Sequence, residues 1–176
     1  MARLFLDTLV RYRNQGRFLI HEFVLMPDHF HILITPAPEV SLERALQLIK
    51  GGFSFRVKYE LGSNAEVWQE GFTEHRVRNA DDYARHAGYI RENPVEAHLA
   101  ERAATYPYGS AAGGVELDPV PLRLEPGAST PGLKPRTIED AQVAGPKSGA
   151  STDRTEARAV LRTDQARRFH RSEVEK

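Results

Sequence analysis

Two histidines two positions apart, His29 and His31, have a spacing that could support metal chemistry. They follow a Pro-Asp turn and begin an apolar run that predicts a β-strand. Side chains alternate along a strand, so both imidazoles point to one face while Phe30, Ile32 and Ile34 point to the other. Two imidazoles whose Cα atoms lie roughly 7 Å apart can converge on one metal ion. On this spacing alone, however, two core or surface histidines are the commoner explanation.

A tyrosine and an asparagine form a second pair on a later helix, predicted over Ala80 to about Glu92 with Asn79 as its N-cap. Tyr89 and Asn93 are four residues apart and therefore share one helical face. Pro94 disfavours the helical conformation for Asn93, so we expect the helix to stop there and to leave the amide at an open end. Together the two pairs offer two metal ligands, a hydroxyl nucleophile and a further oxygen ligand.

Several of these residues also have plainer interpretations. From its spacing alone, Tyr89 fits a core tyrosine of an amphipathic helix better than a nucleophile, and Tyr83 is a rival nucleophile without a partner at the helix end. Trp68 is more often a core anchor than a platform for stacking bases. Three further histidines are expected at the surface, namely His21, His75 and His86. Of these, His75 could instead face the site.

The remaining elements follow from periodicity and capping signals. An apolar stripe predicts a first helix that ends near Gly16, and alternation predicts the two strands that flank the Pro-Asp turn. Ser41 is the expected N-cap of a second helix. The expected order is a helix over Ala2–Gln15, strands over Arg17–Leu25 and His29–Thr35, a helix after Ser41, and a loop then a strand over Glu66–Arg78.

Composition limits the classes of function. The chain of 176 residues has 24 basic and 24 acidic side chains, so net charge gives no argument for a nucleic-acid partner, and any such argument depends on local clustering. The absence of cysteine excludes disulfides and thiolate chemistry. No apolar run is long enough to cross a membrane and no signal peptide is evident, so we expect a cytoplasmic protein without a membrane partner.

A change in composition near Gly113 divides the chain. Residues 1–112 carry regularly spaced apolar side chains, whereas residues 113–176 are rich in proline, glycine and charge. Such a segment cannot bury enough apolar surface to offset its chain entropy. We expect a catalytic domain over 1–112 and a disordered tail over 113–176 that serves as a linker, with a weak exposed helix over Thr155–Arg168.

With these features in place, the chain resembles the one-tyrosine HUH transposases of bacterial insertion sequences, and among them the REP-associated tyrosine transposases. Three blocks in a specific order and spacing carry the resemblance, which extends over about Ala2 to Tyr108. The blocks are Leu-Met-Pro-Asp-His-Phe-His over 25–31, Val-Trp-Gln-Glu-Gly-Phe over 67–72, and Tyr-Ile-Arg-Glu-Asn-Pro over 89–94.

The resemblance implies an α+β fold, a ferredoxin-like αβ sandwich with a central antiparallel sheet. It implies that His29, His31 and Asn93 hold a divalent metal that polarises the scissile phosphate of single-stranded or hairpin DNA. Tyr89 would attack phosphorus, leaving a 5′-phosphotyrosine link and a free 3′-hydroxyl. Magnesium prefers oxygen ligands, whereas two imidazoles suit manganese. We therefore expect Mg²⁺ or Mn²⁺ to support activity, with Mn²⁺ binding more tightly.

Basic side chains on two elements are candidates for phosphate contacts. Lys50, Arg56 and Lys58 lie on the flank of the second helix, where a solvated face is the plainer interpretation. Arg76 and Arg78 lie near the third strand.

The chain departs from the family at its start, because family members usually have a further strand before the first helix. A start codon assigned too late, a truncated copy, or a partner or tail segment that fills the gap would each explain this, and we favour the first two explanations. Two other functions stay open: a truncated or domesticated protein that binds hairpin DNA without cutting it, and a zinc-storing protein without DNA affinity. The DNA sequence recognised, the mobility of the parent element, and the choice between monomer and homodimer are not fixed by the sequence.

Overall fold

The computed structural model describes residues 1–69, 71–120 and 158–164. Within these ranges the helices are α1 (Ala2–Asn14), α2 (Leu42–Leu61) and α3 (Ala80–Glu96), with short 3₁₀ turns η1 (Ala103–Thr105) and η2 (Ser110–Ala112). The strands are β1 (Phe18–Leu25), β2 (His29–Pro36), β3 (Thr73–Arg76) and β4 (Arg158–Asp164). The three helices expected in residues 1–112 and the three expected strands are therefore confirmed, with shifts at their ends.

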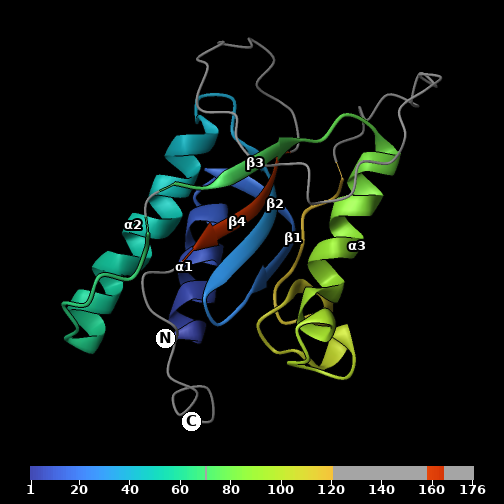
Figure 1. Ribbon diagram of the computed structural model, residues 1–176. Helices are drawn as coiled ribbons and strands as arrows, with labels where there is room; N and C mark the ends of the chain where they lie inside the picture. Colours follow the sequence, from blue (N-terminus) through green and yellow to red (C-terminus); the bar gives the residue numbers. More distant parts are fainter. Residues whose placement is uncertain (70, 121–157, 165–176) are drawn as a thin grey trace.

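The strands form one antiparallel sheet in the order β1-β2-β4-β3. Figure 1 shows α1 and α2 on one side of this sheet and α3 on the other. Because β2 and β3 are each antiparallel to β4, they run parallel to one another, and α2 is the crossover between them. This split βαβ unit confirms the predicted α+β sandwich of ferredoxin-like type.

Strand β4 corrects one prediction for the C-terminal segment. The expected helix over Thr155–Arg168 is wrong where the structure describes it, since residues 158–164 form a strand. The crossover through α2 leaves room for one strand between β2 and β3, and the unpaired backbone groups along that gap favour an extended segment over a helix. A later segment of this chain therefore occupies the position between β2 and β3, as one of the three expectations allowed.

The folded part also extends past the predicted boundary at residue 112. The Asp118 carboxylate accepts hydrogen bonds from the Arg13 guanidinium at 2.7 and 2.9 Å and from the Ile20 amide at 2.8 Å. These donors hold the pKa of Asp118 below its ordinary value, mainly through Arg13. Residues 115–118 thus pack onto α1 and β1, while the rest of the predicted tail, 121–157 and 165–176, lies outside the described residues.

Two cores follow from the two covered faces of the sheet. The larger core lies between the sheet and helices α1 and α2, and Trp68 packs there against the rings of Phe5, Phe30 and Phe53, as predicted for a core anchor. The smaller core lies between the sheet and α3, and includes Ile90. Burial on both sides explains why all but one of the β1 residues are buried rather than every second one. Among the described residues, no helix is long and apolar enough to span a membrane.

Helix α3 begins as predicted and ends later than predicted. The Asn79 side chain accepts a hydrogen bond from the Asp82 amide, as an N-cap does. The helix then continues through Pro94 to Glu96, with Ala97 donating to the carbonyl of Asn93. The expected end at Asn93 is therefore wrong. Proline costs the helix a hydrogen bond, and the burial of Asn93 and Pro94 against the sheet outweighs this cost.

Candidate metal centre and nucleophile

The two histidines of β2 converge as their spacing predicts. Their Nε2 atoms lie 3.0 Å apart, and their rings meet edge to face. His29 donates from Nδ1 to the Asp28 carboxylate at 2.6 Å, which leaves its Nε2 as the atom with the lone pair. Phe30, between the two histidines, points into the opposite core. The tight turn after β1 therefore aims both imidazoles toward the face covered by α3.

This pair of atoms fits a divalent metal ion. Two neighbouring ligands of a six-coordinate ion, each bound at about 2.1 Å, lie about 3 Å from one another, which is close to the observed separation of the Nε2 atoms. The carboxylate behind His29 is the kind of partner that orients a metal-bound imidazole and increases its basicity. The donor set can hold a metal without rearrangement of the strand.

Tyr89 is the tyrosine that the fold brings to the histidines. Its ring lies against the His31 ring, with 5.3 Å between centroids. Tyr83 instead contacts His21, and burial together with the charge of Glu22 raises the pKa of its phenol. A raised pKa opposes formation of the phenolate, the better nucleophile. The contact with His31 therefore favours Tyr89, and the raised pKa of its phenol argues against Tyr83.

Asn93 lies one helical turn beyond Tyr89 and is buried, with 8% of its surface exposed. Because α3 continues past it, the side chain projects from a regular helix instead of an open helix end. Its place on the face shared with Tyr89 agrees with the predicted spacing. The structure thus keeps the amide on the side of α3 that carries the tyrosine, and a role as a metal ligand stays a prediction.

An ion pair between a buried glutamate and a half-exposed arginine, which the sequence did not reveal, fixes α3 on the sheet. The Glu22 carboxylate, 3% exposed, accepts hydrogen bonds from Arg91 and from the Ser110 hydroxyl at 2.6 Å. Arg91 is two residues from Tyr89, so the pair sets the position of the tyrosine-bearing turn. The sequence signal for this ion pair was a glutamate inside an apolar strand, because a buried carboxylate requires a charged or hydrogen-bonding partner.

A β-bulge in β1 explains the position of Glu22 and corrects a prediction for His21. The register with β2 shifts between Ile20 and Glu22, so that His21 and Glu22 both contact groups on the α3 side of the sheet. His21 is therefore buried, not at the surface as expected, and lies 2.8 Å from the Thr35 hydroxyl. A strictly alternating pattern of inward and outward side chains contains no bulge, so it could not predict that His21 is buried.

The structure divides the five basic candidates into two groups. On α2, Lys50 donates to the carbonyl of Gln69 at 2.7 Å, and Arg56 binds Glu60 and Thr8. This helix covers the face of the sheet opposite the histidine pair. The other candidates are exposed: Lys58 on α2, Arg76 at the end of β3, and Arg78 in the turn before α3. Phosphate contacts by any of the five residues stay predictions.

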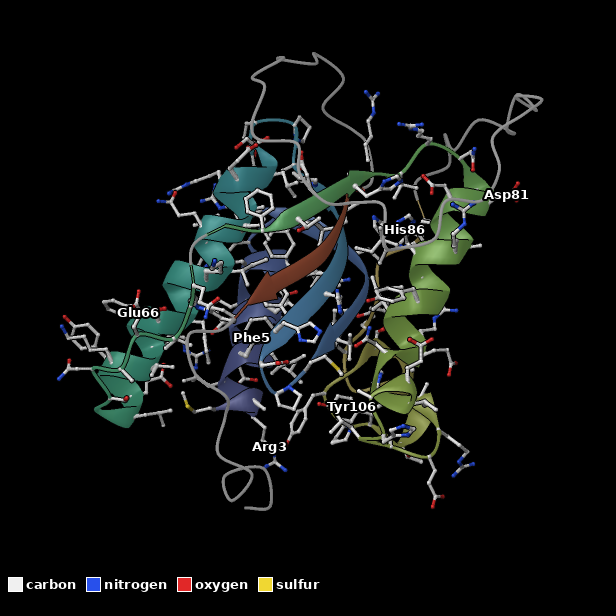
Figure 2. All side chains as sticks on the ribbon, viewed as in Figure 1. Arg3, Phe5, Glu66, Asp81, His86 and Tyr106 are labelled. Atoms are coloured by element: carbon white, nitrogen blue, oxygen red, sulfur yellow. The ribbon has the colours of Figure 1, made fainter. Side chains whose placement is uncertain are left out.

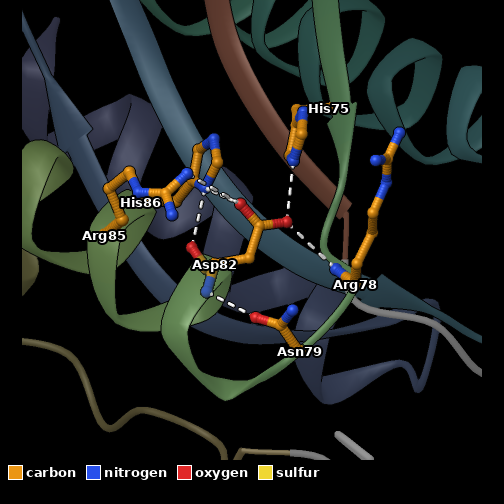
Figure 3. Close-up of polar contacts among 6 residues, drawn as sticks. All are labelled: His75, Arg78, Asn79, Asp82, Arg85 and His86. Carbon is orange, nitrogen blue, oxygen red and sulfur yellow. Dashed lines mark hydrogen bonds and ion pairs between the residues drawn. The ribbon is translucent and has the colours of Figure 1, made fainter. Parts of the chain in front are cut away.

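Two histidines expected at the surface instead join a carboxylate near the start of α3. His75 on β3 and His86 on α3 approach Asp82 from two sides (Figure 3), and all three are partly or fully buried. The helical spacing of Asp82 and His86, four residues apart, was visible in the sequence. His75 could not be added because its position depends on how β3 packs beside α3.

The fold and this arrangement define an HUH-type protein, in which a His-hydrophobic-His strand faces a helix that carries a tyrosine. The family model described as "Transposase IS200 like" matches residues 3–93, just over half of the chain, and the chain belongs to this family. This confirms the family predicted from the three sequence blocks.

The similar curated proteins point to one branch of the family. The chain is 26% identical over 103 residues to the REP-associated tyrosine transposase of Escherichia coli strain K12, covering 58% of this chain and 59% of that protein. It is 30% identical over 108 residues to a protein of Haemophilus influenzae named as a putative REP-associated tyrosine transposase, covering 55% and 61%. The chain thus spans about three fifths of the length of these relatives. No solved structure is significantly similar to it.

Proposed function

We propose that this chain cuts and joins single-stranded DNA through a covalent tyrosine intermediate, as a transposase of the REP-associated type. The observation that carries the proposal is the contact between the Tyr89 ring and His31, whose Nε2 lies 3.0 Å from that of His29. A hydroxyl nucleophile and a pair of metal-ligating atoms in one place are what phosphoryl transfer to tyrosine requires.

In the proposed reaction the Tyr89 oxygen attacks a DNA phosphorus atom. A bond forms between that oxygen and phosphorus, and the bond from phosphorus to the preceding 3′-oxygen breaks. The phenol loses its proton and the departing oxygen gains one, so the products are a 5′-phosphotyrosine and a free 3′-hydroxyl. Attack by another 3′-hydroxyl reverses the step and joins strands, so no nucleotide cofactor is needed.

His29 and His31 would hold the divalent metal, with Asn93 as the third protein ligand. When bound, the metal would polarise the phosphate and offset the charge that develops on its oxygens. Asp28 would keep His29 in the tautomer that binds metal through Nε2. We propose Mg²⁺ or Mn²⁺ as the ion, with tighter binding of Mn²⁺ because two imidazoles favour it.

Each of these groups comes from one chain, which supports a site that works without a residue from a second copy. Among the basic candidates, Arg76 at the end of β3 and Arg78 in the turn before α3 are exposed, and we propose that they contact phosphates. Lys50 and Arg56 bind groups of the protein itself, so we propose a smaller contribution from them.

The test is a denaturing gel of the purified chain with a labelled single-stranded hairpin oligonucleotide. We expect a boiling-resistant protein–DNA adduct with Mn²⁺ or Mg²⁺ and none with a chelator. Tyr89→Phe should abolish the adduct and leave DNA binding intact. Tyr83→Phe is the matched control and should still form it.

Equal adduct formation by the Tyr89→Phe variant would remove Tyr89 from the role, and adduct formation in chelator would remove the metal. DNA binding by the folded wild-type chain without any adduct would indicate the alternative, a hairpin-binding protein that does not cut. Such a protein should bind independently of metal and with a steep dependence on salt.

A further inference from the structure

A cluster formed by His75, Asp82 and His86 lies apart from the histidine pair of β2. His75 comes from the short strand β3, and the other two from the first two turns of α3. Figure 3 shows both imidazoles beside the Asp82 carboxylate, and Figure 2 places His86 on the side of α3 toward the sheet. The proposed DNA reaction uses none of the three.

The geometry points to a second metal site, in which His75, Asp82 and His86 bind a divalent transition-metal ion such as Zn²⁺. One ligand atom from each residue lies within 4.8 Å of the other two. His75 Nε2 is 2.8 Å from Asp82 Oδ2, and His86 Nδ1 is 3.4 Å from Asp82 Oδ1. His86 Nδ1 also donates to the backbone carbonyl of Asp82 at 2.8 Å, a contact that a metal bound to this nitrogen would replace. Ligands bound at about 2.1 Å in a tetrahedron lie roughly 3.4 Å apart, so the three ligand atoms are already close to the required spacing while the imidazoles have to turn.

The types of ligand and their burial agree with this site. Two imidazoles and one carboxylate are ligands that zinc and similar ions accept. The carboxylate is 10% exposed and the His86 side chain 13%, whereas the His75 side chain is 33% exposed and leaves an opening for a water ligand. The two imidazole rings stack with 4.4 Å between centroids and 17° between their planes, so one ring has to rotate for both nitrogen lone pairs to meet at one ion.

Burial and hydrogen bonds set the charge states of His86 and Asp82. Burial is the main reason that the pKa of His86 lies below its ordinary value, and the neutral imidazole is the form that binds metal. Burial opposes the charge on Asp82, yet hydrogen bonds from His75 and the Arg78 amide outweigh it and hold the carboxyl pKa below its ordinary value. Asp82 is therefore ionised at neutral pH.

Two positive neighbours of the cluster work against a cation. The Arg85 guanidinium lies 3.6 Å from Asp82, and the positive end of the α3 dipole is close. The Arg85 side chain is 73% exposed, so it can turn into solvent when a metal binds. The dipole acts on the cation through space, whereas the three protein ligands bond to it directly.

A metal in this position would join β3 to α3. Strand β3 has four residues and pairs with one neighbour, β4. Its connection to α3 through His75, Asp82 and His86 would hold the first turns of the helix that carries Tyr89. The ion would therefore have a structural role, distinct from the metal proposed at His29 and His31.

The experiment measures bound Zn²⁺ by equilibrium dialysis and elemental analysis, with no DNA present. The His29→Ala/His31→Ala variant removes the first site and should still bind one Zn²⁺ per chain. Adding His75→Gln or Asp82→Asn should reduce this to none, whereas adding the exposed His98→Asn should leave it at one. The wild-type chain should lose one equivalent with His75→Gln, and Zn²⁺ should raise Tm in every variant that retains the cluster.

Zinc binding that vanishes in the His29→Ala/His31→Ala variant would overturn the proposal, as would a full equivalent retained after His75→Gln. His75 is the most exposed of the three residues, so its variant tests the proposal even if Asp82→Asn fails to fold. Since the measurement contains no DNA, failure of the second metal site and failure of the tyrosine reaction are separate results.

Discussion

At the residue scale, the ion pair between Glu22 and Arg91 connects sequence, packing and site. The Glu22 carboxylate is buried on β1, while the Arg91 side chain is 48% exposed on α3, two residues from Tyr89. The carboxylate holds the pKa of Arg91 above its ordinary value through their hydrogen bond. The pair thus holds the turn of α3 that carries Tyr89 against β1.

We predict that Arg91→Ala lowers the free energy of unfolding by roughly 2 kcal/mol, because it leaves a buried carboxylate with Ser110 as its remaining partner. Urea denaturation measures the change. Arg85→Ala is the control, since Arg85 is mostly exposed and should cost less than about 0.5 kcal/mol. Equal losses in the two variants would contradict the role of the Glu22 pair.

His21 gives a prediction for pH dependence. Burial lowers its pKa, although the Asp118 carbonyl and the charges of Asp118 and Glu22 act in the opposite direction; the Tyr83 ring also packs against it. Between its folded pKa and its unfolded value near 6.5, the unfolded chain binds more protons. The free energy of unfolding therefore falls as pH drops below about 6.5.

We predict that His21→Gln reduces the loss of stability between pH 7.5 and 5.5, because glutamine does not titrate. Chemical denaturation across this range measures the slope. His98→Asn is the control, since His98 is exposed and its φ of 55° suits asparagine. An unchanged slope in His21→Gln would show that His21 does not carry the effect.

The sequence predicts the positions of some site residues and not of others. The common direction of His29 and His31 follows from strand alternation, and the shared face of Tyr89 and Asn93 follows from the helical period. The burial of His21 depends on a bulge, and the meeting of His75 with Asp82 depends on the packing of two elements. Contacts between elements have no local signal.

At the element scale, α3 and β4 show where local rules fail. Pro94 predicts a helix end, yet the helix continues because Asn93 and Pro94 are themselves buried against the sheet. Residues 158–164 lie in a segment whose composition predicts disorder or a weak helix, yet they pair with β2 and β3. In both cases tertiary contacts outweigh local preference.

We predict that Val160→Pro in β4 lowers the free energy of unfolding by about 1–3 kcal/mol, because proline removes an amide from a central strand. Val160 pairs with Ile32 of β2 and Glu74 of β3. Hydrogen exchange of the β2 amides should become faster. Val160→Thr retains strand propensity and is the control; unchanged exchange in the proline variant would show that β4 does not protect β2.

At the scale of the whole molecule, one chain brings together the parts of the candidate site. The sheet carries the histidines on the face that α3 covers, and the opposite face holds the larger core with Trp68. The α+β class and the family were predictable because three separate sequence blocks agree on them. The strand that completes the sheet was not, because its position is a property of the assembled fold.

The central claim is that Tyr89 becomes covalently linked to DNA, and tryptic mapping of the adduct tests it most directly. Cleavage after Arg78, Arg85 and Arg91 places Tyr83 in the peptide 79–85 and Tyr89 in the peptide 86–91. After nuclease trimming, mass spectrometry should find the nucleotide mass on peptide 86–91. The same mass on peptide 79–85, or on a peptide without either tyrosine, would contradict the account.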